Sequence, residues 1–231
     1  METPLTDIQA LKTWIESPDP GPARILAAGE IDELQDYLLP DEKGYVEKAI
    51  AKRVKEFTAG RSLARLLMQL LGDEPSALHP GDRRMPLWPE GLTGSITHCD
   101  THCACALARV GKTQSVGIDM EHIGRISDEL WRQLFTANEQ ARLRDLNSED
   151  RQRHATIIFS AKEAFYKLQY PITRSWLNFM DAEVSIQDDG HFRLTLLKDP
   201  SELGLSTGNF EGSYCSPFEE TVLSQIWLAE D

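Results

Sequence analysis

The stretch FSAKEAFYKLQYP, residues 159–171, decides the fold because its pattern occurs twice in the chain. Residues 57–67, FTAGRSLARLL, align with residues 159–169 at an offset of 102, which places Arg65 opposite Lys167. A similar segment precedes each copy: DELQDYLLPDEKGYV before the first and DELWRQLFTANEQARL before the second. Two matches in the same order favour a duplicated half. The sequence therefore predicts two pseudo-symmetric α+β lobes.

Hydrophobic periodicity predicts the elements of both lobes. Helical patterns cover residues 6–16, 30–38, 43–71, 127–134, 137–146 and 149–169, and Pro171 is expected to end the last of these helices. Strand patterns cover ACALARV, SVGIDME, AEVSIQ, HFRLTLL and TVLSQIWLA. The turn Asp188-Asp189-Gly190 predicts that AEVSIQ and HFRLTLL form a hairpin, and HPGDRRMPLWPEGLTGS (residues 79–95) is expected to be a long loop.

The composition is typical of a globular protein. The chain has 231 residues, of which 41% are hydrophobic, enough for one large domain or two packed halves. We expect a cytoplasmic protein, because no stretch reaches the ~20 apolar residues of a membrane span and the N-terminal sequence lacks signal-peptide features. A net charge of −13 argues against a general nucleic-acid or anionic-membrane binder. Four cysteines, at positions 99, 103, 105 and 215, are expected to be reduced and to serve packing.

Asp119 and Glu121 end the strand pattern SVGIDMEHI. Side chains two apart on a strand project from the same face, so the two carboxylates are expected to lie together. Such like charges repel unless a cation lies between them, and hard oxygen ligands at this spacing suit Mg2+. The alternative is a solvated strand end, with no metal.

Glu163 and Lys167 lie four residues apart and share one face of the predicted helix. Most such pairs are surface ion pairs that contribute ~0.3–0.5 kcal/mol. The aromatic neighbours Phe159, Phe165 and Tyr166 indicate instead that the helix packs against the body of the protein. A partly buried glutamate there could be a metal ligand or a general base, and the lysine could neutralise a leaving phosphate.

GSITHCDTHCACALA raises zinc as a rival, because His98, Cys99, His102, Cys103 and Cys105 are suitable ligand types. The spacing is unfavourable, since no second Cys-x-x-Cys pair follows. His98 is better suited to hydrogen bonding an anion, with a satisfied core histidine as the alternative. Other candidate anion contacts are basic: Lys52, Arg53, Lys55, Arg61, Arg65, Arg83 and Arg84. Because glycine-rich phosphate-loop motifs are absent, side-chain cations and a metal would have to bind any phosphate.

Three segments taken together, GSITH (residues 94–98), VGIDME (residues 116–121) and FSAKEAFYK (residues 159–167), resemble the ordered motifs of the Sfp/EntD-type 4′-phosphopantetheinyl transferases. The last two match the family patterns at every fixed position. The resemblance covers about residues 51–181 and looks most like the EntD branch. It implies an α+β fold of two pseudo-symmetric lobes, each a small antiparallel sheet packed with a long helix. Residues 1–112 would bind the nucleotide end of coenzyme A, and residues 113–231 would carry Mg2+ and the catalytic residues.

The resemblance implies transfer of phosphopantetheine from coenzyme A to a serine of an apo acyl, peptidyl or aryl carrier protein, with release of 3′,5′-ADP. It implies that Asp119, Glu121 and Glu163 hold Mg2+, that Glu163 takes the serine proton directly or through a metal-bound water, and that Lys167 assists the leaving group. Coenzyme A phosphates would be contacted by Arg53, Arg61, Arg83 or Arg84, Thr97, His98, Lys162 and Lys167.

The expected protein is a monomer, and the EntD-like appearance favours a role in siderophore synthesis, with nonribosomal peptide or polyketide synthesis also open. Two alternatives differ in class. One is a non-catalytic module that binds coenzyme A or a carrier protein, and the other is a Mg2+-dependent phosphohydrolase that uses the same carboxylates. Because carrier proteins are usually acidic, as this chain is, docking is expected to depend on an apolar patch with a few basic residues.

Overall fold

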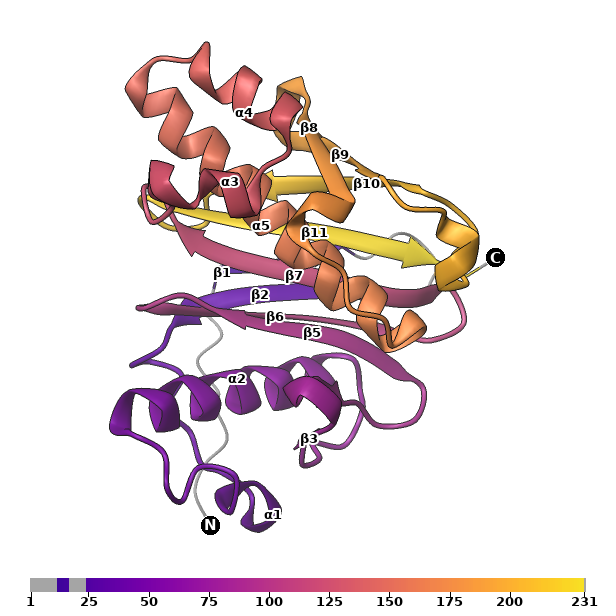
Figure 1. Ribbon diagram of the computed structural model, residues 1–231. Coiled ribbons are helices and arrows are strands. Elements are labelled where there is room, and N and C mark those ends of the chain that lie inside the picture. The colour runs from indigo at the N-terminus through magenta and orange to yellow at the C-terminus, as the bar shows by residue number, and fades with distance from the viewer. Residues whose placement is uncertain (1–11, 17–23, 231) are drawn as a thin grey trace. The chain divides into compact units, whose positions relative to one another are not determined.

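The computed structural model describes residues 12–16 and 24–230 (Figure 1). The chain divides into two compact units. Among the described residues, unit 1 comprises residues 12–16, 24–116 and 228–230, and unit 2 comprises Gly117–Trp227. The first boundary falls inside the long strand β7 (Thr113–His122). Both units combine helices with antiparallel strands, which confirms the predicted α+β class.

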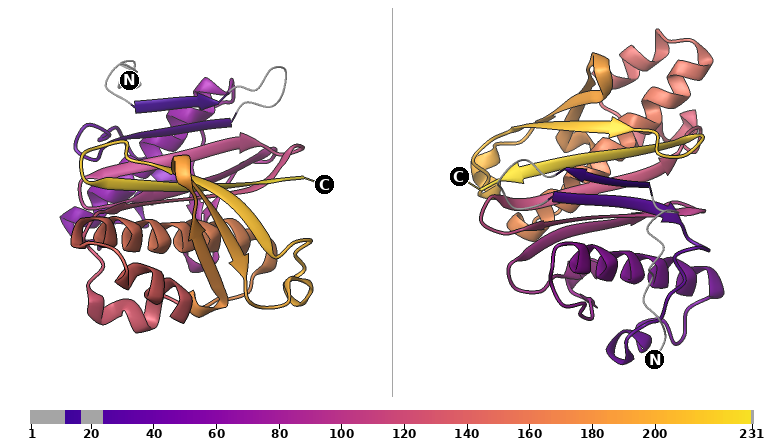
Figure 2. Two further views of the ribbon diagram at one scale, coloured as in Figure 1. Left: turned by 90° about the horizontal axis from the view of Figure 1, so that it is seen from above. Right: turned by 180° about the vertical axis from the view of Figure 1, so that it is seen from behind.

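Unit 1 is a four-stranded sheet with one long helix packed on it. The strand order is β1 (Lys12–Glu16), β2 (Arg24–Glu30), β6 (His102–Arg109) and β5 (Leu92–His98), with each neighbouring pair antiparallel. Helix α2 (Ala51–Leu70) covers one face of this sheet (Figure 2). Its apolar face, with Leu63 and Leu67 fully buried, forms the core with β2 and β6. The small elements are α1 (Pro40–Lys43), β3 (His79–Pro80), η2 (Asp82–Arg84) and β4 (Pro86–Leu87).

Unit 2 has a larger sheet and several helices. The strand order is β7, β11 (Thr221–Ala229), β10 (Asn209–Cys215), β9 (His191–Leu196) and β8 (Ala182–Ile186). Helix α5 (Ser148–Thr173) packs on this sheet, with the rings of Phe165 and Phe210 4.7 Å apart. The other helical elements are η3 (Asp128–Leu130), α3 (Trp131–Leu134), α4 (Ala137–Arg144), η4 (Phe179–Asp181), η5 (Asp188–Gly190) and η6 (Pro200–Leu203).

The structure corrects several predicted elements. Residues 12–16 form a strand rather than the end of a helix, and residues 6–11 lie outside the described residues. Residues 30–38 form no helix: Glu30 ends β2, residues 31–34 form turns, and residues 35–38 are irregular, because the helical hydrogen bond from Leu34 N to Glu30 O is not continued. Helix α2 begins only at Ala51, after the extended N-cap Ile50. Strands β2, β5 and β10 were not predicted, and β5 begins inside the expected long loop.

The ends of α5 and the β8–β9 turn follow from local sequence. Asn147 caps the helix by accepting hydrogen bonds from two backbone N–H groups of the first turn. The helix continues through Pro171 to Thr173, contrary to the prediction, and ends where Arg174 adopts a left-handed conformation with φ +55°. β8 and β9 form the predicted antiparallel hairpin, and φ is positive at both Asp189 and Gly190.

A buried ion pair occurs at equivalent places in the two units. In unit 1, Arg65 donates to Glu42 at 2.8 Å, and in unit 2, Lys162 donates to Glu139 at 2.7 Å. Each glutamate also accepts the N–H of the residue at the start of its short helix, and each ion pair spans 23 positions. In both units, a buried ion pair therefore links a short helix to the long helix.

The buried ion pairs align the two halves of the chain at a different offset from the predicted one. Glu42 and Glu139 are 97 positions apart (139 − 42), and so are Arg65 and Lys162 (162 − 65). The sequence alignment at 102 had placed Arg65 opposite Lys167. The buried contacts make Lys162 the counterpart of Arg65, because both side chains neutralise the same buried carboxylate.

Candidate active site

Strand β7 approaches helix α5 so closely that only glycine fits at position 117. A Cβ atom there would lie 1.8 Å from the backbone oxygen of Ala164 and 2.7 Å from the backbone nitrogen of Leu168. Two residues further along β7, the hydroxyl of Ser160 on α5 donates to the carbonyl of Asp119 at 2.9 Å. This contact holds Asp119 beside the face of α5 that carries Glu163 and Lys167.

Lys167 pairs with Asp119 rather than with Glu163. Its Nζ lies 2.8 Å from Asp119 Oδ1, across 48 positions of sequence. Among the described residues, no ion pair within 4 Å joins Glu163 to Lys167, so the surface pair that the four-residue spacing usually indicates does not form. Asp119 is 4% exposed, and both helix residues are partly buried.

Three carboxylates influence one another at this point. Burial and then the nearby Asp119 and Glu163 raise the pKa of Glu121 to about 7, against the opposing effects of Arg125 and Lys167. Burial and Asp119 also raise the pKa of Glu163. Within the described part of the chain, no hydrogen bond to the Glu163 carboxylate is found. These three buried or partly buried acidic groups disfavour one another's charge, and their carboxylate oxygens are the ligand type that Mg2+ prefers.

Lys162 does not lie where the resemblance implied. Its side chain is 0% exposed, and its Nζ donates to Glu139 at 2.7 Å and to the carbonyls of Leu134 and Phe179 at 3.0 and 2.8 Å. All three ammonium donors are therefore used inside the protein. The predicted contact between Lys162 and a coenzyme A phosphate is corrected: this lysine anchors the helix that carries Glu163.

Aromatic rings pack along α5 near the carboxylates. Phe159 stacks on Phe179 with ring centroids 5.5 Å apart, and Tyr166 meets the same ring edge-on at 5.3 Å. The Tyr166 hydroxyl is buried without a hydrogen-bond partner among the described residues, and burial followed by Glu163 raises its pKa. These contacts confirm that this part of the helix packs against the body of unit 2.

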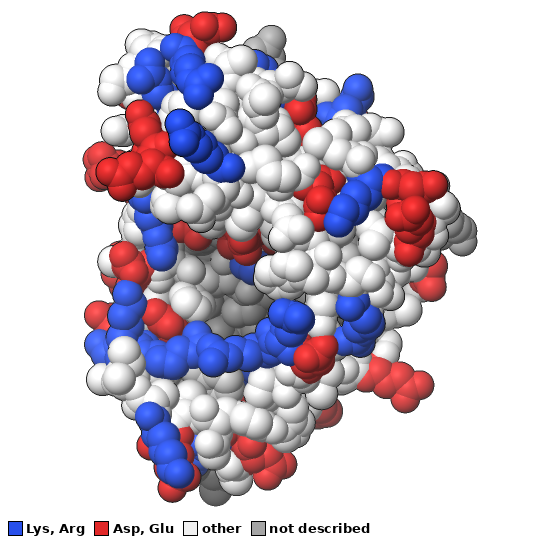
Figure 3. Space-filling model, in the orientation of Figure 1, with Lys and Arg blue, Asp and Glu red and all other residues white. Residues whose placement is uncertain are grey.

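Unit 1 brings together several of the predicted anion contacts. Arg53 NH1 donates to His98 Nε2 at 3.2 Å, and Glu56 lies 3.4 Å from the same guanidinium. The Arg61 guanidinium lies 4.1 Å from the centroid of the Phe57 ring, and its Nε donates to the carbonyl of Leu78 at 3.1 Å. Arg61 is only 6% exposed, and burial lowers its pKa. Figure 3 shows Lys and Arg side chains gathered over the part of unit 1 that contains α2 and β5.

The remaining predicted contacts differ in exposure. Thr97 is buried on β5, next to the partly exposed His98. Arg83 and Arg84 are both exposed, and both have positive φ, 49° and 65°. Two consecutive non-glycine residues in this region are uncommon, which makes the loop conformation a specific feature of the chain.

The cysteines serve packing, as predicted. All four are free thiols, and Cys103 and Cys105 belong to the hydrophobic core of unit 1. Burial raises the pKa of Cys105 well above its usual value, which favours the thiol over the thiolate that zinc binds. The burial of both side chains in the hydrophobic core agrees with a packing role.

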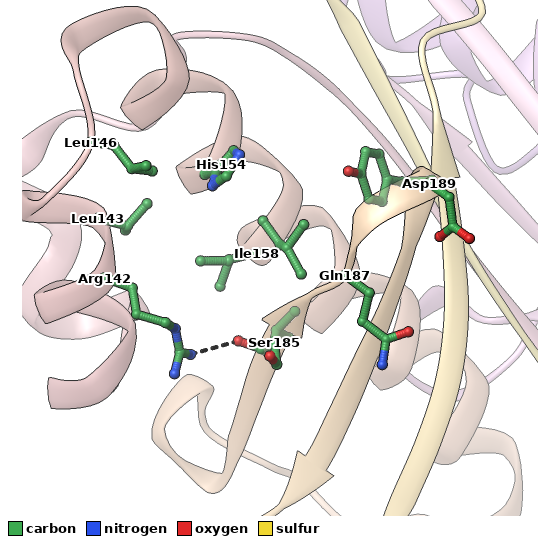
Figure 4. A pocket seen from close by; sticks show the side chains of 11 residues that line it. Arg142, Leu143, Leu146, His154, Ile158, Ser185, Gln187 and Asp189 are labelled. Carbon is green, nitrogen blue, oxygen red and sulfur yellow. Dashed lines mark hydrogen bonds between the residues drawn. The ribbon is translucent and has the colours of Figure 1, made fainter.

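A cavity of about 420 Å³ lies elsewhere in unit 2, bounded by α4, α5 and β8 (Figure 4). Leu143, Leu146 and Ile158 form its apolar side, and Arg142 crosses it to donate to the Val184 carbonyl at 2.8 Å. Neither the three carboxylates nor Lys167 is among its lining residues. Glu163 and Lys167 of α5 therefore do not line this cavity.

Sequence reasoning missed three residues that shape the site. Ser160 holds Asp119, Glu139 anchors Lys162, and Arg125 pairs with Glu121 at 3.2 Å. Only Glu139 had a usable signal, because Thr136 and Glu139 have the capping-box spacing and do form that box. Ser160 and Arg125 are common residue types at unremarkable spacings, so only the folded chain shows their partners.

Asp119, Glu121 and Glu163 lie near one another on β7 and α5, and Lys167 is bound to Asp119. Two family models cover most of the chain: residues 41–108 match the 4′-phosphopantetheinyl transferase N-terminal domain, and residues 115–218 match the 4′-phosphopantetheinyl transferase superfamily. The protein belongs to the 4′-phosphopantetheinyl transferase family of enzymes.

Individual relatives agree with this assignment. The chain is similar to 4′-phosphopantetheinyl transferase Svp of Streptomyces mobaraensis, with 35% identity over 201 residues, 86% of this chain and 81% of that protein. It is also similar to enterobactin synthase component D of Escherichia coli (strain K12), with 33% identity, 58% of this chain and 63% of that protein. A solved holo-[acyl-carrier-protein] synthase from Thermotoga maritima aligns with a TM-score of 0.40 and 19% identity, over 50% of this chain and 63% of that one.

Within the described residues, none of the helices has the length and apolar character needed to span a membrane.

Proposed function

We propose that this protein transfers the 4′-phosphopantetheine group of coenzyme A to a serine of an apo carrier protein and releases 3′,5′-ADP. The observation that carries the proposal is the close approach of β7 to α5 at Gly117, which gathers Asp119, Glu163 and Lys167. Family membership supports the reaction, and the donor set supports the need for a metal.

The residues that would hold the metal are Asp119, Glu121 and Glu163. Mg2+ suits this site because it prefers hard oxygen ligands and usually takes only a few carboxylates together with phosphate oxygens. When bound, it would neutralise the pyrophosphate oxygens on which negative charge develops.

Glu163 would act as the general base toward the incoming serine hydroxyl. Burial and Asp119 raise its pKa, and no hydrogen bond within the described chain occupies its carboxylate, so it can accept a proton. The proton would pass from the serine oxygen to a Glu163 carboxylate oxygen as the serine attacks the phosphorus that bears pantetheine. The bond from that phosphorus to the bridging oxygen would break, and 3′,5′-ADP would leave.

Lys167 would stabilise the charge on the departing ADP. Its ammonium is held 2.8 Å from Asp119 Oδ1, so the lysine is already oriented beside the carboxylates before substrate arrives. Because Lys167 is partly exposed, its remaining donors can reach a phosphate oxygen.

Basic residues of unit 1 would bind the nucleotide end of coenzyme A. Arg53 and His98 are in contact, and Arg61 flanks the Phe57 ring that also lies near Arg53, which supports one anion-binding cluster. Thr97 adjoins this cluster, and Arg83 or Arg84 would supply a further charge from the exposed loop. The assignment of these residues to the 3′-phosphate follows from the family resemblance.

The proposal extends to a monomer that acts in the cytoplasm, where four free cysteines would stay reduced. Its carrier protein would belong to siderophore synthesis, because enterobactin synthase component D is among the relatives. Other nonribosomal peptide or polyketide carriers have the same reacting serine and are alternative substrates.

Intact mass spectrometry of apo carrier proteins tests the function. Aryl, peptidyl and acyl carriers are incubated with the enzyme, coenzyme A and Mg2+, and a parallel sample contains EDTA. A metal-dependent gain of one phosphopantetheine mass is expected. Coenzyme A binding without any gain across the carriers would favour a binding module, whereas phosphate or pyrophosphate release without a carrier would favour a phosphohydrolase.

A further inference from the structure

A second cavity in unit 2, of about 270 Å³, is rich in arginine. It lies among η3, α3, α4 and the first turns of α5, and its wall consists of Asp128, Trp131, Arg132, Gln140, Arg144 and Arg151. Three arginines thus line one small space together with a single acidic residue. This is unusual in a chain whose net charge is −13.

The three arginines have no acidic partner in the described structure. None of them takes part in an ion pair within 4 Å, and Asp128 does not either. Some exposed arginines elsewhere in unit 2 are paired, such as Arg193 with Glu211 at 2.7 Å and Arg142 with Glu183 at 3.3 Å. The cavity therefore carries a local excess of about two positive charges, counted from three guanidinium groups and one carboxylate.

Hydrogen bonds position two of the arginines and leave donors unused. Arg151 donates through Nε to the Leu143 carbonyl at 3.2 Å and through NH2 to the Leu146 carbonyl at 2.8 Å, which fixes it across the end of α4. Arg144 donates one bond to Gln140 Oε1 at 3.1 Å. No hydrogen bond from the Arg132 side chain is found among the described residues. Each guanidinium has five donors, so most of the donors around the cavity remain available.

The wall also includes a buried donor and an aromatic face. Trp131 is 6% exposed, and its indole N–H has no acceptor within the described structure. Gln140 is already committed, because its amide nitrogen donates to the carbonyl of Phe135 at 2.8 Å. The wall is thus fixed in place and rich in donors, and it offers an indole ring to an organic group.

We propose that this cavity binds a dianionic phosphate group, separately from the catalytic carboxylates. Arginine suits this ligand because its planar fork binds two phosphate oxygens at once, and three forks match a tetrahedral anion better than a planar carboxylate. The cavity is larger than a bare phosphate, so a phosphate monoester of a small organic molecule fits, with its organic part against Trp131. Figure 3 shows basic side chains beside a group of acidic ones over the region of α3 and α4.

Calorimetric titration of the full chain tests this proposal without coenzyme A or a carrier protein. Inorganic phosphate and phenyl phosphate are the probes, and chloride replaces them at equal ionic strength in the reference. Saturable binding is expected for both probes. Tighter binding of phenyl phosphate identifies an organic phosphate as the ligand, and equal binding identifies inorganic phosphate.

Arg132→Gln is the decisive variant, because no hydrogen bond or ion pair of its side chain is found in the described structure. It is expected to weaken phosphate binding about tenfold, as does Arg144→Gln, since each removes a charged, forked donor. Arg193→Gln is the matched control, because it removes an equal charge from an exposed pair on β9. Phosphate should also shift the Trp131 indole N–H resonance in the wild type, and Trp131→Phe assigns that signal.

Two results would overturn the proposal. Equal weakening by Arg132→Gln and Arg193→Gln would mean that phosphate senses only diffuse charge. Absence of saturable phosphate binding, together with a higher KM for a carrier protein in Arg132→Gln, would mean that these arginines dock a protein instead. The titration does not depend on catalysis, so its outcome is independent of the proposed transferase activity.

Discussion

At the scale of single residues, Glu163 is the group on which the proposed chemistry depends. Glu163→Gln keeps the size and removes the base, so transfer is expected to fall by about 10²–10⁴-fold, while the urea unfolding midpoint stays near that of the wild type. Initial rates of carrier modification measure the first effect. Glu211→Gln, on the exposed surface of β10, is the control. Full activity in Glu163→Gln would refute the assigned role.

Lys162 is predicted to act on stability, although it neighbours the base. Lys162→Met leaves Glu139 as a buried carboxylate without its cation, so the free energy of unfolding should drop by about 3–5 kcal/mol. Urea denaturation measures the loss. Lys198→Met removes an exposed lysine that pairs with Asp181, and should cost less than about 1 kcal/mol.

The double variant Lys162→Met/Glu139→Gln separates this explanation from a simple packing defect. Removing the buried charge along with its partner should restore part of the lost stability, because the uncompensated carboxylate is gone. No recovery in the double variant would show that the charge on Glu139 is not the cause.

The raised pKa of Glu121 predicts how metal binding depends on pH. Its pKa is raised to about 7, so the folded protein holds a proton on this carboxylate below that pH, and the proton must leave before the metal binds. The affinity for Mg2+ should therefore be highest above pH 7 and fall by up to about tenfold per pH unit below it. Calorimetry between about pH 6 and 8 checks the trend. Glu121→Gln should bind more weakly with a flatter pH profile, and an unchanged slope would contradict this assignment.

At the scale of elements, the contact between β7 and α5 sets the geometry of the site. Gly117→Ala forces a Cβ into a space 1.8 Å from the Ala164 backbone oxygen, so the strand must move away from the helix. Stability should fall by about 3 kcal/mol or more, and transfer by more than tenfold, because Asp119 moves with the strand. Denaturation and initial rates measure the two effects.

Gly44→Ala is the matched control for this prediction. Gly44 has φ −59°, and an added Cβ would meet nothing within 4 Å, so alanine should be neutral or slightly stabilising. If both alanine variants behaved alike, the close approach of β7 to α5 would not be what requires glycine at position 117.

The elements also show where local sequence succeeds. The hairpin β8–β9 was predicted because Asp188-Asp189-Gly190 supplies the left-handed conformations that a tight turn requires. Helix α5 was predicted through most of its length, but its end was not. Pro171 lies in the last turn, and the helix ends only at Thr173. Residues 12–16 and 24–30 pair as β1 and β2, and that pairing outweighs the helical pattern assigned to the first of these segments.

At the scale of the whole molecule, the net charge of −13 bears on how a carrier protein docks. If docking relies on an apolar patch with a few basic residues, the transfer rate should fall less than about threefold from low to physiological salt. Initial rates across a chloride series at saturating coenzyme A measure this. A much steeper fall would show that long-range electrostatic attraction drives the encounter.

The sequence by itself determined the family and the α+β class, and it supplied the candidate carboxylates of the site. The family follows from the resemblance of three motifs, and strand and helix periods place Asp119, Glu121 and Glu163 on defined faces. Only the tertiary structure decided which carboxylate each of the two lysines of α5 contacts. Lys162 and Lys167 both lie on the same helix as Glu163, yet one is buried on Glu139 and the other lies on Asp119. Those partners are 23 and 48 positions away, and which of them a flexible side chain meets is fixed only when the elements pack.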